Sequence, residues 1–79
     1  KITAVSAALP TAGWSGKTQT VSVAGVTASA VVQATYDPAC RAAWIDADVY
    51  CSAQGAGTLT FACDTVPTAA LTANIVIIA

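Results

Sequence analysis

The sequence contains no histidine, no glutamate and no methionine, and only 9% of its 79 residues are charged. Without histidine and glutamate, general acid–base catalysis and zinc binding lose two of their commonest side chains. Three basic and four acidic side chains give a net charge of −1, too little positive charge to neutralise nucleic-acid phosphates or to hold the chain on an anionic membrane. We therefore expect no enzyme activity, no cofactor and no nucleic-acid partner.

Membrane spans and targeting segments are also missing from the sequence. The longest uncharged segment, residues 18–36, contains threonine, serine, glycine and glutamine among its apolar residues. A membrane span needs about 20 predominantly apolar residues, so this segment does not qualify. No basic segment followed by an apolar one opens the chain, as a signal peptide would. At 79 residues, the chain is expected to form a single domain, residues 1–79. Because it begins at Lys1 and has no methionine, we expect this domain to be cut from a longer protein.

The cysteine pattern is that of neither a metal site nor a disulfide framework. Cys40, Cys51 and Cys63 are odd in number, form no CxxC pair, and have no histidine to complete a zinc site. Free cysteine is among the most buried residue types. The sequence therefore predicts buried thiols that pack as small apolar side chains.

What the chain does contain is a hydrophobic share of 56%, arranged largely in alternation with threonine and serine. This pattern predicts half-buried strands at residues 2–8, 17–24 and 29–35, and a further strand at residues 71–78. In the second strand, Gln19, Val21 and Val23 share one face. The last strand is the most apolar, which predicts either a strand covered on both faces or, at the edge of a sheet, a site of aggregation. We expect Ile75 and Ile77 to contact other copies of the chain.

One short helix interrupts the strands. Asp37 precedes Pro38, and an aspartate cap followed by proline at the first helical position is typical of a helix start. The sequence predicts a helix near residues 38–46 that lies on a sheet, because two turns do not persist alone. Trp44 is expected to anchor it.

A hairpin is predicted from residues 49–54 and 58–63 around a three-residue loop, Gly55-Ala56-Gly57. In that register Cys51 lies opposite Phe61, and Cys51 is diagonal to Cys63, which does not favour a disulfide. With the other strands, the fold class expected is all-β and mainly antiparallel. We expect a compact β-sandwich of about six strands with one short helix, or a partial barrel.

Two sequence patterns suggest chemistry and fail on inspection. Gly16-Lys17-Thr18 looks like the end of a phosphate-binding loop, but the required glycine is replaced by Thr11, and a strand follows instead of a helix. Asp46 and Asp48 are spaced like glycosidase carboxylates only if the chain there is extended. They flank a helix-to-strand junction, where aspartate commonly serves a turn.

Single residues give two further candidates. Cys40 sits near a helix start beside Arg41, surroundings that favour a reactive thiol, but no base accompanies it. Trp14 lies in a glycine-rich loop and is a candidate ligand-binding residue, since exposed aromatic rings stack on carbohydrates. Alternatively, its ring folds back and plugs one end of the sandwich.

Three segments together resemble a known module: TAGWSG (residues 11–16), TQTVSVAGVTA (18–28) and CSAQGAGTLTFACDTVP (51–67). Over residues 8–78 the chain is similar to a small C-terminal module found in prophage-type tail-fibre, baseplate and collagen-like proteins of Firmicutes. The resemblance carries no catalytic motif and defines no binding residues. Cys40 and Trp44 fall in a segment that varies in this module.

The resemblance implies a non-catalytic structural or adhesion module at the end of a phage tail fibre or surface fibre. Its partners would be copies of itself, with a trimer favoured, and a host cell-surface glycan or protein. It would be located in the virion tail or at the cell surface. The alternative function is a carbohydrate-binding module of a secreted or cell-surface protein, acting through Trp14.

Overall fold

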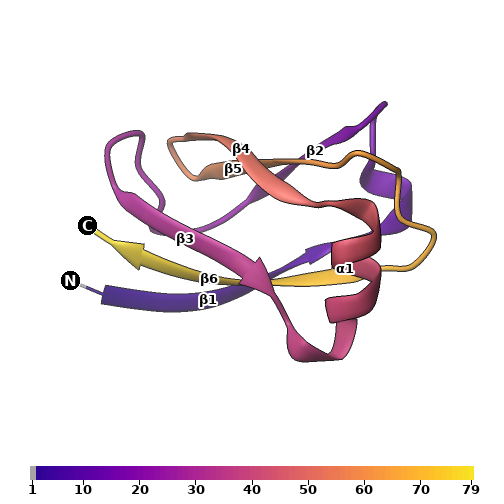
Figure 1. The fold of residues 1–79 in the computed structure, drawn as a ribbon. Helices are drawn as coiled ribbons and strands as arrows, with labels where there is room; N and C mark the ends of the chain where they lie inside the picture. Colours follow the sequence, from indigo (N-terminus) through magenta and orange to yellow (C-terminus); the bar gives the residue numbers. More distant parts are fainter. Residues whose placement is uncertain (1) are drawn as a thin grey trace.

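Six antiparallel strands form two three-stranded sheets in a computed structural model, which describes residues 2–79. The strands are β1 (Ile2–Leu9), β2 (Thr18–Ser22), β3 (Val31–Tyr36), β4 (Tyr50–Gly55), β5 (Thr58–Ala62) and β6 (Leu71–Ile78). One sheet has the order β1-β6-β3 and the other the order β2-β5-β4. The two sheets lie as two layers (Figure 1), so the expected all-β sandwich is confirmed.

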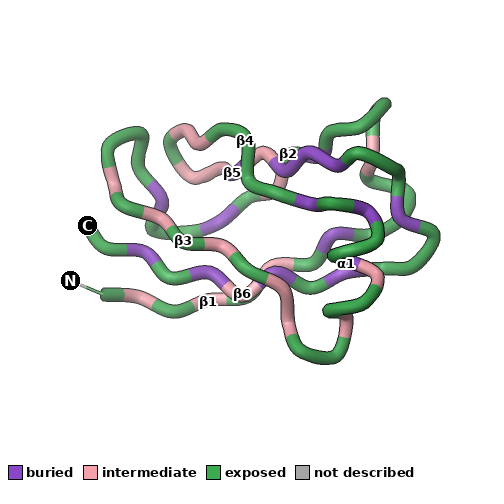
Figure 2. The backbone as a smooth tube through the Cα atoms, in the orientation of Figure 1, coloured by how far each residue is buried: buried purple, intermediate pink, exposed green. Residues whose placement is uncertain are grey.

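The alternation of the sequence becomes the two faces of each strand. In β6, Leu71, Ala73, Ile75 and Ile77 are buried, while the residues between them face outward. In β2, Gln19 and Val21 face inward and the hydroxyl residues face outward, as predicted. Buried positions line the space between the layers (Figure 2), so the core consists of the inner faces of both sheets.

The helix begins as its capping residues predict. The Asp37 carboxylate accepts a hydrogen bond from the Ala39 backbone N–H at 3.0 Å, ahead of a 3₁₀ turn, Pro38–Cys40, and the helix α1 (Arg41–Ala47). Trp44 packs edge-on against Phe61 of β5 and Tyr36 of β3, with ring centroids 6.0 and 6.4 Å apart. Trp44 therefore contacts a ring from each sheet. Neither this helix nor any other in residues 2–79 has the length and apolar character needed to cross a membrane.

The β4–β5 hairpin differs from the prediction in its loop. Gly55 pairs with Thr58, so the loop has two residues, and a β-bulge between Cys51 and Ala53 shifts the register. The bulge brings Cys51 opposite Phe61, the pair that the sequence predicted with a longer loop. Gly57 has a φ of +74°, a left-handed conformation that glycine adopts without steric cost.

Gly13 lies in a 3₁₀ turn, Thr11–Gly13, that follows β1 and is held by the side chain of Gln19. Gln19 is buried, and its amide donates a hydrogen bond to the Pro10 carbonyl at 3.2 Å. A Cβ on Gly13 would overlap the Gln19 Oε1 atom and lie 2.6 Å from its Cδ. The absence of a side chain at Gly13 is thus what allows the amide to reach Pro10.

Replacing Gly13 with alanine should lower the free energy of unfolding by about 1–3 kcal/mol, the range of an overpacked interior site. Urea denaturation followed by tryptophan fluorescence would measure it. In the double variant with Gln19→Ala, the loss should be smaller than the sum of the two single losses, because the overlapping atoms are gone. Strictly additive losses would contradict this explanation.

Candidate functional site

Within residues 2–79, the strands β1, β6 and β3 present no charged side chain on their outward surface, which we call the outer face; Asp37 borders it just after β3, where its N–H bonds the Thr72 carbonyl at 2.9 Å. The residues of the outer face project from alternate positions of the three strands: Ile2, Ala4, Ser6, Ala8, Val31, Gln33, Thr35, Thr72, Asn74, Val76 and Ile78. All of them are exposed except Asn74, which is half-buried. No helix or second sheet of the described chain covers this face (Figure 1).

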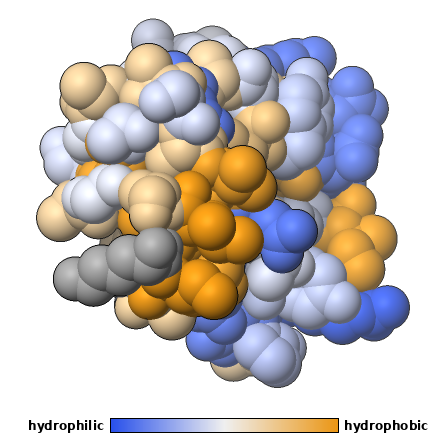
Figure 3. Space-filling model, turned by 90° about the vertical axis from the view of Figure 1, so that its left-hand side faces the viewer, coloured by the Kyte–Doolittle hydropathy of each residue, from blue (hydrophilic) through white to orange (hydrophobic). Residues whose placement is uncertain are grey.

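One end of the outer face is apolar. Ile78 pairs with Ile2 on one side and with Val31 on the other, so these three residues form a row across the sheet, the apolar row. They are 43%, 70% and 57% exposed. Val76 lies next to this row along β6. In Figure 3, which views the end of the molecule where both termini lie, a hydrophobic patch is visible.

The other sheet presents a different outward surface. Thr18, Thr20 and Ser22 of β2 are exposed, and the hydroxyls of Thr20 and Thr60 are hydrogen-bonded at 2.9 Å. Hydroxyl groups on a surface are well solvated, so covering them with another chain gains little free energy. Of the two sheet surfaces, the outer face is the one that gains from being covered.

A shallow depression of about 340 Å³ lies on the outer face between β1 and β6. Ala4 and Ser6 line it from β1, and Asn74 and Val76 from β6. The short side chain of Ala4 leaves this space open. The depression therefore combines apolar walls with polar groups from Ser6 and Asn74.

Comparisons of the chain with family models, with curated proteins and with solved structures gave no match.

Ile75 and Ile77, which the sequence suggested as contacts between copies, lie in the core and are each 1% exposed. The exposed apolar residues of β6 are instead Val76 and Ile78. The physical reason is the strand period of two: Thr72 and Asn74 are polar and face outward, and Val76 and Ile78 continue that same face. Continuing the alternation of Thr72 and Asn74 through residues 75–78 would have identified Val76 and Ile78 as the outward residues.

Trp14, the candidate ligand-binding residue, is half-buried and packs against the core. Its indole Nε1 is buried and has no hydrogen-bond partner among residues 2–79. The Trp14 ring thus packs against the core, and its polar atom does not face solvent.

The aspartates do not converge on a site. Asp46 is exposed near the end of α1, and Asp48 is an exposed left-handed residue whose N–H bonds the Ile45 carbonyl at 3.1 Å. In residues 2–79 there is no group of three cysteine or aspartate side chains placed to hold a metal ion. Asp48 therefore ends the helix, as expected for a turn-forming aspartate.

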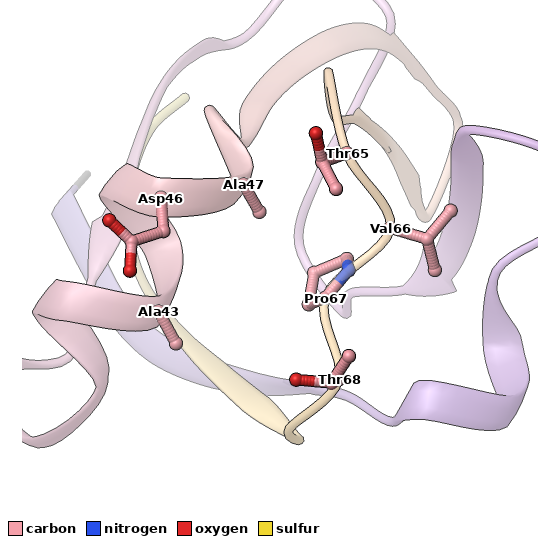
Figure 4. A pocket seen from close by; sticks show the side chains of 7 residues that line it. All are labelled: Ala43, Asp46, Ala47, Thr65, Val66, Pro67 and Thr68. Atoms are coloured by element: carbon pink, nitrogen blue, oxygen red, sulfur yellow. The ribbon is translucent and has the colours of Figure 1, made fainter.

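A small hollow of about 210 Å³ lies between α1 and the loop that precedes β6 (Figure 4). Helix and loop residues line it: Ala43, Asp46, Ala47, Thr65, Val66, Pro67 and Thr68. The Asp46 carboxylate points away from the loop in Figure 4. The volume is below the 300–1,000 Å³ typical of small-molecule sites, and no charged group is directed into it.

The three thiols are free and differ in exposure. Cys63 is buried as predicted, and burial raises the pKa of its thiol, partly offset by Lys17. Cys40 is half-buried and donates to the carbonyls of Asp37 and Thr72, each at 3.4 Å. Cys51 is exposed, which corrects the expectation of a buried thiol; partial desolvation still raises its pKa.

The segment Gly16-Lys17-Thr18, which looks like the end of a phosphate-binding loop, has Lys17 in the turn before β2. The strand β2 follows it, and not the helix that such a loop requires.

Proposed function

We propose that this chain is a non-catalytic assembly module, which associates with copies of itself through the outer face. The observation that supports the proposal most directly is the apolar row, which leaves Ile2, Val31 and Ile78 exposed side by side at one end of the outer face. Charged residues are depleted in the centres of protein interfaces. An exposed apolar patch on a soluble protein commonly marks such a contact.

The resemblance to fibre modules suggests the kind of assembly in which the chain would act. A domain at the end of a phage tail fibre or surface fibre is one of several identical chains that run side by side. Each copy then needs a surface that suits its neighbours and does not repel them. An outer face without charge meets that need, and attachment to a host cell would be a role of the assembled end.

Replacing Val76 with aspartate should shift the protein from oligomer to monomer, because each copy would bring a carboxylate into a contact from which water is excluded. The measurement is light scattering coupled to size-exclusion chromatography. The outer face spans roughly 26 by 14 Å, from strand rise and spacing. This is about half of the ~800 Å² per partner of a standard interface, so the mass must be recorded over a concentration series.

The matched control is Thr20→Asp, which puts the same charge at the centre of the exposed face of the other sheet. It should keep the wild-type mass at every concentration. Circular dichroism would verify that both variants stay folded. A wild-type chain that is monomeric throughout the series would refute the proposal.

A carbohydrate-binding module is the weaker candidate. It depends on Trp14, whose polar atom is buried and whose ring packs on the core. A sugar could bind only to the part of the Trp14 ring that the core leaves exposed.

A further inference from the structure

The pairing of β1, β6 and β3 arranges the outer face in rows, each of which contains one residue from every strand. The apolar row is Ile2, Ile78 and Val31; the next row is Ala4, Val76 and Gln33; a third is Ser6, Asn74 and Thr35. These three rows become more polar with distance from the chain ends, and beyond them Ala8 pairs with Thr72 beside Asp37. The polarity of the outer face therefore changes along the strand direction over these rows. Its β1 and β3 edges carry different side chains.

We propose that neighbouring copies pack their outer faces around a rotation axis parallel to β6, so that β3 of one copy lies against β1 of the next. The inference rests on the proposed function, since it specifies how the copies meet on that same face. It commits to a second copy of this chain as the occupant of the outer face. Rotational symmetry of this kind is the commonest form of association between identical chains.

The gradient of the rows favours this axis. Rotation about a line parallel to β6 leaves the position along the strands unchanged, so each row meets the same row of its neighbour. Val31 then meets Ile2, and Thr35 meets Ser6. An axis perpendicular to the strands and lying in the plane of the sheet would reverse the order of the rows and set Ile78 against Thr72. Only the first arrangement covers apolar groups with apolar groups and leaves hydroxyls to pair with hydroxyls.

The shapes of the second row fit the same arrangement. Gln33 is a long side chain at the β3 edge, and Ala4 is a short one at the β1 edge, beside the shallow depression. With β3 against β1, the Gln33 side chain of one copy reaches the depression of the next. Its amide there meets the polar groups of Ser6 and Asn74, which line that depression.

Cysteine cross-linking tests this geometry. In a Cys51→Ser background, which removes the exposed native thiol, the pair Ala4→Cys and Gln33→Cys places one thiol on each edge of the outer face. Within one chain these residues flank β6, at about 9–10 Å from two strand spacings, too far for a disulfide. Oxidation should therefore join different chains, giving covalent dimers or larger rings on a non-reducing gel that disappear with reductant.

The matched control is the pair Thr20→Cys and Ala53→Cys in the same background, which flanks Thr60 of β5 on the other sheet and should remain single chains. If both pairs cross-link equally, the links come from random collision and the proposed arrangement is overturned. If light scattering shows an oligomer but the Ala4→Cys and Gln33→Cys pair stays unlinked, the arrangement is wrong while the assembly function stands. A chain that is monomeric at every concentration overturns both.

Discussion

Replacing Ile75 with aspartate should leave the chain unfolded at neutral pH. Ile75 is 1% exposed at the centre of β6, between β1 and β3. Removing its side chain alone should cost about 2–5 kcal/mol, and an unpaired buried carboxylate costs several more. The total stability of a 79-residue chain is roughly 4–12 kcal/mol at about 0.05–0.15 kcal/mol per residue. Circular dichroism and proton NMR dispersion would show the loss of fold.

The neighbouring substitution Val76→Asp provides the control for this prediction. It introduces the same group one residue along the same strand, but on the outer face. It should stay folded, even where association is lost. If Ile75→Asp folds as well as Val76→Asp, the inward and outward faces of β6 are not as described.

Trp44→Ala should be the most damaging substitution outside the sheets, lowering the free energy of unfolding by about 3–5 kcal/mol. The Trp44 ring packs edge-on against Phe61 of one sheet and Tyr36 of the other. No other described aromatic pair joins the two layers through the helix. Its loss would leave a cavity and release α1 from the sandwich. Urea denaturation measures the change.

Ile45→Ala is the matched control for the helix, because Ile45 follows Trp44 directly and is 50% exposed. Alanine also has the higher helix propensity. The change in the free energy of unfolding should therefore be under about 1 kcal/mol. Equal losses from Trp44→Ala and Ile45→Ala would show that the tryptophan is not the anchor of the helix.

Local patterns in the sequence predicted most of the elements. Residues 71–78 were predicted as a strand and form β6, and Asp37 caps the turn before α1 as expected. Such features depend on neighbouring residues alone, on a period of two or on one side chain bonding a nearby N–H. The sandwich class followed because strands that do not alternate regularly with helices have few ways to bury one face each.

Features that depend on pairing between distant residues were less accessible. Gly55 and Gly57 both suit a turn, so the sequence does not decide between a loop of two residues and one of three. The bulge near Ser52 carries no compositional mark, because one unpaired residue of any type shifts the register. The outer face itself draws residues from both ends of the chain and from β3, and only the order of strands in the sheet unites them.

The pairing of Ile2 with Ile78 also decides how the module responds to mechanical load. Strands β1 and β6 run antiparallel along their whole length, from this pair to Leu9 and Leu71. A pull applied at residues 2 and 78 would separate the two strands like a zipper and break the ladder one step at a time. A filament under tension would therefore be weakest where it ran through this fold. The proposed assembly module would therefore suit a free tip or a side branch, where no force passes from residue 2 to residue 78.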